Sequence, residues 1–225
     1  MRDYLSESNL VKAAGLAVVL TVMSLGRLIE ARQPLGLYIP ATFVAMTLIA
    51  GAVTAWGQRA GMPGIVTDRR TFLRGAAVAA GLSLLALPLY LFVLDPLLKT
   101  ALLTSRHRTI VELSYPSTWE GRLSLVLWSA GFQALFLQAA PMSLFARLTG
   151  RRSAAVGLCL ALRAYVSYRQ VASAGVADGV PLLFVSALVT TAAGCVVFAR
   201  FGLAPAMLFA AGLDLHVFFA GAGSR

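Results

Sequence analysis

Long apolar runs recur along the whole chain, and they constrain its fold more than any other feature of the sequence. A helix that crosses a bilayer needs about 20 mainly apolar residues. Seven segments come close to that length or exceed it. In chain order they are 10–28, 35–56, 72–98, 123–148, 154–169, 180–199 and 203–219. Because backbone polar groups in lipid must be satisfied within their own segment, we predict an all-α, polytopic helical membrane protein with about seven transmembrane helices.

The low share and the placement of charged residues support this prediction and argue against nucleic acid as a partner. Only 12% of the residues are charged, whereas soluble domains average about 25%, so we expect one helical transmembrane domain over residues 1–225. The net charge is +10. Its arginines lie mainly in short gaps between apolar runs, which is typical of loops that face anionic headgroups and not of a nucleic-acid surface. We expect a multi-pass protein of a bacterial-type inner (plasma) membrane whose first segment is retained.

Two longer polar stretches separate the predicted spans. Residues 57–74 are rich in Gly, Pro and Arg and are predicted to be a loop. Residues 99–122 form the longest polar loop, within which 109–113 fits either a short strand or an interfacial helix. Prolines inside a membrane helix usually produce kinks. The prolines that fall within predicted spans are Pro88, Pro96 and Pro141.

Three polar residues lie deep within predicted spans, where polarity is costly. At about 1.5 Å per residue, Gln133, Arg163 and Asp214 all fall near the bilayer midplane. One hypothesis is that Arg163 and Asp214 form an intramembrane ion pair, with Gln133 hydrogen-bonded alongside. The alternative is that Arg163 extends toward the Arg169 end of its helix, while Asp214 is protonated or faces a water pocket. In either case we expect a structural polar cluster.

The remaining reactive residues form no recognisable catalytic or metal-binding pattern. His216 is two residues from Asp214, so a helix directs the two side chains to different faces, and we interpret His216 as interfacial. His107 falls in a polar loop. Cys159 and Cys195 lie in apolar runs and are interpreted as membrane-buried thiols. We therefore predict no catalytic residues, no metal and no cofactor.

The second half of the chain, 123–219, resembles the CAAX-protease and bacteriocin-processing family, also called Abi membrane proteases. That family carries a Glu-Glu-x-x-x-Arg motif, a Phe-x-x-x-His motif and a His-x-x-x-Asn/Asp motif in successive spans. Here 132–137 occupies the first place, and the basic turn 149–152 follows it. Residues 165–169, which begin with Tyr165, fall at the second, and the hairpin 201–214 at the third.

The resemblance lies in layout and not in the motif residues. Asp214 alone keeps an identity compatible with the family. The replaced positions are Phe132 and Gln133 for the two glutamates, Leu137 for the motif arginine, and Arg169 and Ala210 for the two histidines. The resemblance implies a degenerate, non-proteolytic relative, because a glutamine amide cannot act as a general base.

Three classes of function remain open. The first is a non-catalytic membrane protein, either pseudo-protease-like or an accessory subunit that packs against other membrane subunits through its many Gly and Ala residues. The second is an active intramembrane protease of the CAAX/Abi type. It would use Asp214, His216 and either Glu120 or Glu112, although helical spacing opposes their convergence. The third is a small transporter or channel component with broken spans at Pro88 and Pro141. We favour the first, which makes the chain a non-enzyme whose partners are the bilayer and other membrane subunits.

Overall fold

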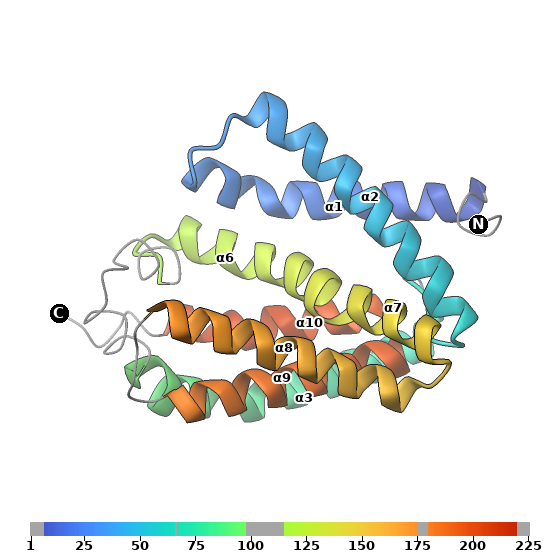
Figure 1. Ribbon diagram of the computed structural model, residues 1–225. Helices are drawn as coiled ribbons and strands as arrows, with labels where there is room; N and C mark the ends of the chain where they lie inside the picture. The colour runs from blue at the N-terminus through green and yellow to red at the C-terminus, as the bar shows by residue number, and fades with distance from the viewer. Residues whose placement is uncertain (1–6, 66, 98–114, 175–179, 220–225) are drawn as a thin grey trace.

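The computed structural model of the protein describes residues 7–65, 67–97, 115–174 and 180–219, and none of these residues lies in a strand (Figure 1). The α-helices are α1 (Glu7–Glu30), α2 (Leu35–Arg59), α3 (Arg69–Leu89), α6 (Trp119–Phe132), α7 (Ala140–Thr149), α8 (Arg152–Ala174), α9 (Val180–Phe201) and α10 (Leu203–Asp214). Two π-helical turns and one 3₁₀ turn extend them: Tyr90–Leu94, Gln133–Ala139 and Leu215–Phe218. The predicted all-α class is confirmed for the described residues.

Among the residues that the structure describes, five helical segments are long and apolar enough to cross a membrane. They are Asn9–Glu30, Leu35–Arg59, Arg69–Leu97, Trp119–Thr149 and Phe184–Phe201. The other two predicted spans are helical but do not meet this measure. The segment 154–169 lies inside α8, which carries Arg163 and Arg169, and 203–219 forms a shorter apolar helix that ends at Phe218.

Side-chain caps place two helix starts earlier than the sequence predicted. The carboxylate of Asp68 accepts hydrogen bonds from the backbone N–H of Thr71 at 3.0 Å and from its hydroxyl at 2.5 Å, so α3 begins inside the predicted loop 57–74. The Thr118 hydroxyl accepts from the N–H of Gly121 at 3.1 Å, so α6 begins inside the predicted loop 99–122. The segment 109–113 lies outside the described residues.

One π-helical turn precedes Pro96 and another precedes Pro141. In each case a single residue separates the turn from the proline. Immediately before Pro96, the N–H of Asp95 donates to the carbonyl of Tyr90, five residues earlier. Ala140, immediately before Pro141, donates to Leu135 in the same way. The wider turn makes room for a proline ring that lacks an N–H. At Pro141 the regular α-helical pattern is thus interrupted by a π-helical turn, while the helical segment Trp119–Thr149 continues through the proline.

The helices form a bundle around the short helix α10. Figure 1 shows α1 and α2 as a pair on one side, and this pair packs against α6 and α7. Helix α10 packs against α3, α6 and α9, while α8 packs against α7 and α9. Six of the twelve residues of α10 are buried, among them Leu203, Ala206 and Phe209. Its short length is thus compatible with a position inside the bundle.

Glycines allow polar side chains to cross between helices at three contacts. Gly212 of α10 faces the Ser83 side chain of α3, Gly194 of α9 faces Gln138, and Gly26 of α1 faces Ser124 of α6. A Cβ atom at any of these glycines would overlap the facing side chain. The predicted use of small residues for close helix packing is therefore found within the bundle.

Candidate functional site

A buried acid, a buried imidazole and a partly buried phenol meet where α3, the start of α6 and the end of α10 come together. The Nε2 atom of His216 lies 3.2 Å from Oδ1 of Asp95. The Tyr115 hydroxyl donates to the same oxygen at 2.8 Å. Asp95 is 3% and His216 7% exposed. We call these three residues the Asp95 cluster.

The contacts of His216 limit where the protons of its imidazole ring can lie. Its Nδ1 lies 2.7 Å from the carbonyl oxygen of Leu213. A carbonyl can only accept, so Nδ1 carries a proton. Nε2 lies within hydrogen-bonding distance of Asp95, and the contact becomes a hydrogen bond when the imidazole or the carboxyl group carries one further proton.

The Tyr115 hydroxyl donates a hydrogen bond to the same carboxyl group. Burial and the neighbouring Asp95 carboxylate raise the pKa of the Tyr115 phenol above its ordinary value, so Tyr115 remains a hydrogen-bond donor at neutral pH. The other oxygen of Asp95, Oδ2, is buried and has no hydrogen-bond partner among the described residues. One acceptor position of the cluster is thus unfilled.

Aromatic and arginine contacts hold the Asp95 cluster in place. The ring of Tyr90 stacks on His216 at a centroid distance of 4.8 Å. At the end of the bundle, Arg122 donates to the carbonyl of Pro116 at 3.0 Å and to that of Phe218 at 3.4 Å. These bonds tie the segment before α6 to the 3₁₀ turn that carries His216.

The predicted polar cluster is only partly brought together. The Gln133 amide donates to Oδ2 of Asp214 at 3.4 Å, from the π-helical turn of one segment to the end of α10. Asp214 ends α10 and precedes His216 by two residues. Asp214 thus lies next to the Asp95 cluster and is linked to Gln133.

Arg163 does not join this pair. No ion pair connects Arg163 to Asp214 in the part of the chain that the structure describes. The Nε of Arg163 is buried without a hydrogen-bond partner among those residues. Our hypothesis of an Arg163–Asp214 ion pair therefore has no support in this geometry.

The weaker candidates divide into one buried and two exposed residues. Tyr165 is 61% exposed, and Arg169 is also exposed on α8. His216 is buried against Asp95 and does not face the surroundings of the bundle, while its interfacial depth stays a prediction. Glu120 is exposed in the first turn of α6. His107 and Glu112 lie outside the described residues, and Cys159 and Cys195 are buried free thiols.

Asp95 is the residue that sequence reasoning missed. It is the only carboxylate in the predicted span 72–98, and it lies immediately before Pro96. The rule that selected Asp214, an acid inside an apolar run, selects Asp95 equally well. Its partners could not be found this way, because Tyr115 and His216 lie in other segments of the chain.

The arrangement combines an acid–base pair with an amide–carboxylate pair. An imidazole beside a carboxyl group can give or accept a proton. Within the described ranges, no group of three or more His, Cys, Asp or Glu side chains is placed to hold a metal ion. Comparison of the chain with protein-family models, with curated proteins and with solved structures finds no match.

Proposed function

We propose that this protein is a multi-pass integral membrane protein that does not hydrolyse peptides and serves as an accessory subunit of a larger membrane assembly. Its five long apolar helices support insertion into a bilayer. Large apolar side chains on their outer faces support it too, for example Leu85 at 78% and Phe92 at 79% exposure. Such surfaces are costly in water and suited to lipid. We place the protein in a plasma membrane of bacterial type.

The contact between Gln133 and Asp214 is the observation that carries the non-catalytic part of the proposal. The resemblance to the Abi proteases assigns these residues to the first and third motifs, and they lie 3.4 Å apart. This proximity supports the family-like layout. The chemistry differs, because the amide of Gln133 cannot accept a proton from water. In the family, a carboxylate and histidines would activate the water.

A stripe of small residues on α8 supports the accessory role. Ser153, Gly157 and Ala161 recur every fourth residue and are all exposed. A Cβ at Gly157 would meet no atom within 4 Å, so no described part of the chain packs on this glycine. Small residues at this spacing let another helix approach closely in a membrane. We infer that a helix of the partner subunit packs here.

Purification from native membranes in mild detergent tests the accessory role. We expect a second membrane chain at fixed stoichiometry, and its loss in Gly157→Leu. The matched control is Gly15→Leu on α1, where the glycine also faces open space but has the large neighbours Val11 and Val19 at the same spacing. Retention of the partner in Gly157→Leu would exclude the α8 stripe as its contact.

One observation favours a second candidate function, an intramembrane hydrolase. His216 is oriented by Asp95, as a general base is oriented by an acid. Membrane-anchored peptides incubated with the reconstituted protein distinguish the two proposals. The accessory role predicts background cleavage that His216→Gln and Asp95→Asn leave unchanged. Cleavage that disappears in both variants would establish the hydrolase instead.

A further inference from the structure

Arginines gather at the end of the bundle opposite the Asp95 cluster. They lie where α2 ends, α3 begins, α7 ends, α8 begins and α9 ends, and Figure 1 shows these helix ends at the same end of the molecule. Eight of them are exposed there: Arg59, Arg69, Arg70, Arg74, Arg147, Arg151, Arg152 and Arg200. We call these eight residues the arginine platform.

Contacts between three chain connections hold the arginine platform together. Arg152, the first residue of α8, donates from Nε to the carbonyl of Ala60 at 3.1 Å and from a terminal nitrogen to the carbonyl of Gly61. A Cβ at Gly202, between α9 and α10, would lie 2.8 Å from the carbonyl oxygen of Gly64. The segment between α2 and α3 thus contacts the connection before α8 and the connection after α9. Arginines from distant parts of the sequence are therefore presented on one surface.

The positive charge of the platform is not balanced by acids in the same part of the sequence. Asp68 is the only carboxylate residue in 57–74, 145–155 and 198–205. Both of its oxygens accept hydrogen bonds from Thr71, so it serves as the cap of α3. At the opposite end of the bundle, by contrast, Arg27 pairs with Glu30 at 2.7 Å. Eight arginines against one aspartate make the platform a surface for an anionic partner.

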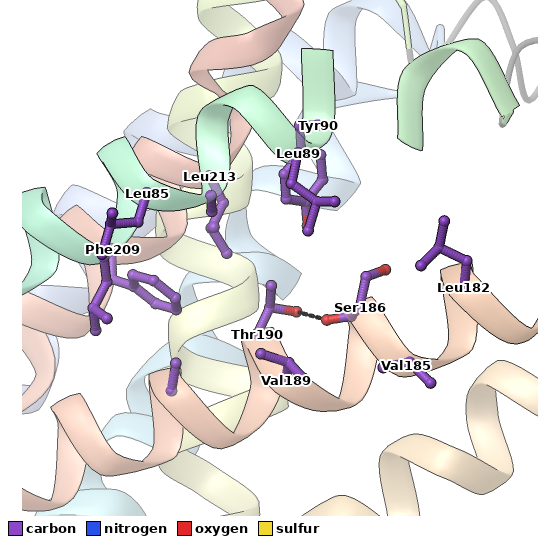
Figure 2. Close-up of a pocket in the computed structure, with 13 residues that line it drawn as sticks. Leu85, Leu89, Tyr90, Leu182, Val185, Ser186, Val189, Thr190, Phe209 and Leu213 are labelled. Carbon is purple, nitrogen blue, oxygen red and sulfur yellow. Dashed lines mark hydrogen bonds between the residues drawn. The ribbon is translucent and has the colours of Figure 1, made fainter. Parts of the chain in front are cut away.

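An exposed apolar surface borders the arginine platform. Leu73 is 54% and Leu148 is 70% exposed, and each is close in sequence to two or more arginines of the platform. Farther along α3 and α9 the exposed side chains are apolar, among them Leu85 and Val189, which Figure 2 shows on these two helices. The platform therefore lies at a boundary between a charged end and an apolar side of the bundle.

Trp56 lies at the same boundary. The guanidinium carbon of Arg147 is 5.2 Å from the centre of the Trp56 ring, which is the geometry of a cation–π contact. Tryptophan and arginine together are typical of the level of lipid headgroups. A phospholipid presents a phosphate with an acyl chain beside it, whereas free phosphate or a nucleic acid has no acyl chain to cover Leu73 and Leu148. The neighbours of the arginines thus favour a lipid among the anionic partners.

We propose that the arginine platform binds the phosphate groups of anionic phospholipids in the surrounding bilayer. The proposal rests on the membrane insertion proposed above. Guanidinium groups match phosphate oxygens with pairs of hydrogen bonds. Each basic side chain near an anionic membrane surface strengthens binding roughly fivefold. A zwitterionic phospholipid carries an ammonium group that offsets its phosphate, so the platform prefers lipids with a net negative charge.

Spin-labelled lipids in vesicles test this assignment. The full chain is reconstituted in phosphatidylcholine that contains a trace of spin-labelled phosphatidylglycerol or of spin-labelled phosphatidylcholine. Electron spin resonance measures the fraction of each label that the protein immobilises. We expect phosphatidylglycerol to be immobilised several-fold more strongly than phosphatidylcholine. This preference should shrink as the salt concentration rises from about 0.05 M to about 0.5 M, because salt screens exposed charges.

Two double variants that remove equal charge supply the matched comparison. Arg70→Gln with Arg151→Gln takes two arginines from the platform and should lower the preference for phosphatidylglycerol several-fold. Arg32→Gln with Arg169→Gln takes two exposed arginines from the opposite end and should preserve it. Equal immobilisation of the two lipids by the natural chain would overturn the proposal, as would an equal loss in both variants.

Two further outcomes would also overturn the proposal, and they are distinguishable. Inorganic phosphate that displaces phosphatidylglycerol more than chloride does at equal ionic strength would assign the platform to free phosphate. Immobilisation of neither lipid would contradict membrane insertion itself, and lipid binding by the platform with it.

Discussion

The imidazole of His216 lies 3.2 Å from the carboxyl group of Asp95, and this contact joins the end of α10 to the end of α3. The two residues are more than a hundred positions apart in the sequence. Their contact, the Tyr115 hydroxyl and the stacked ring of Tyr90 make a polar centre at one end of the bundle.

Removal of both partners of this contact should destabilise the fold by less than the sum of the two single removals. Asp95→Leu or His216→Phe alone leaves a buried polar group without its partner, at a cost of about 3–5 kcal/mol. The double variant should cost clearly less than the sum. The free energy of unfolding in mixed micelles measures this coupling, and strictly additive losses would show that the contact contributes nothing.

Asp214 should be energetically coupled to Gln133 and not to Arg163. A hydrogen bond to a carboxylate predicts a coupling of about 1 kcal/mol between Gln133→Leu and Asp214→Leu. Arg163→Leu and Asp214→Leu should be additive within ~0.5 kcal/mol, because the structure has no contact between them. Two double-mutant cycles in the same detergent decide between the pairs, and a larger coupling to Arg163 would restore the ion-pair hypothesis.

Helix packing at Gly212 should depend on the residue that it faces. Gly212→Ala places a Cβ against Ser83 and should lower the melting temperature, and Ser83→Gly in the same chain should largely restore it. Gly81→Ala on α3 meets open space and should raise stability by about 0.5–1 kcal/mol. If Gly212→Ala behaved like Gly81→Ala, the close approach of α3 and α10 would be disproved.

The cap of α3 should be sensitive to acid. Hydrogen bonds from Thr71 lower the pKa of Asp68 below its ordinary value. A lowered folded-state pKa means that the ionised form stabilises the fold. The stabilisation of the fold by ionised Asp68 is complete above about pH 4. It is lost as the pH falls through the folded-state pKa of Asp68. The stability difference between the natural chain and Asp68→Ala should therefore shrink only in that acid range. A difference that is constant with pH would contradict the cap.

The sequence predicted the helices better than it predicted their contacts. Apolar run length located the five long helices, because each run must supply its own backbone hydrogen bonds. It could not tell that α10 lies inside the bundle, since a short apolar helix has the same composition in either place. Depth alone put Gln133, Arg163 and Asp214 at one level. Which of these side chains meet depends on the rotation of each helix about its own axis. Packing between helices sets that rotation, so the sequence of a single segment does not reveal it. The contact between Asp95 and His216 could not be predicted for the same reason.

We propose that this protein inserts into a membrane and works through a partner and not through hydrolysis. The intact mass of the assembly extracted from native membranes in mild detergent tests it most directly. We predict a mass equal to this chain plus a second membrane subunit at fixed stoichiometry, reduced to the single chain by Gly157→Leu. A natural chain that emerges alone, or only with lipid, would contradict the claim.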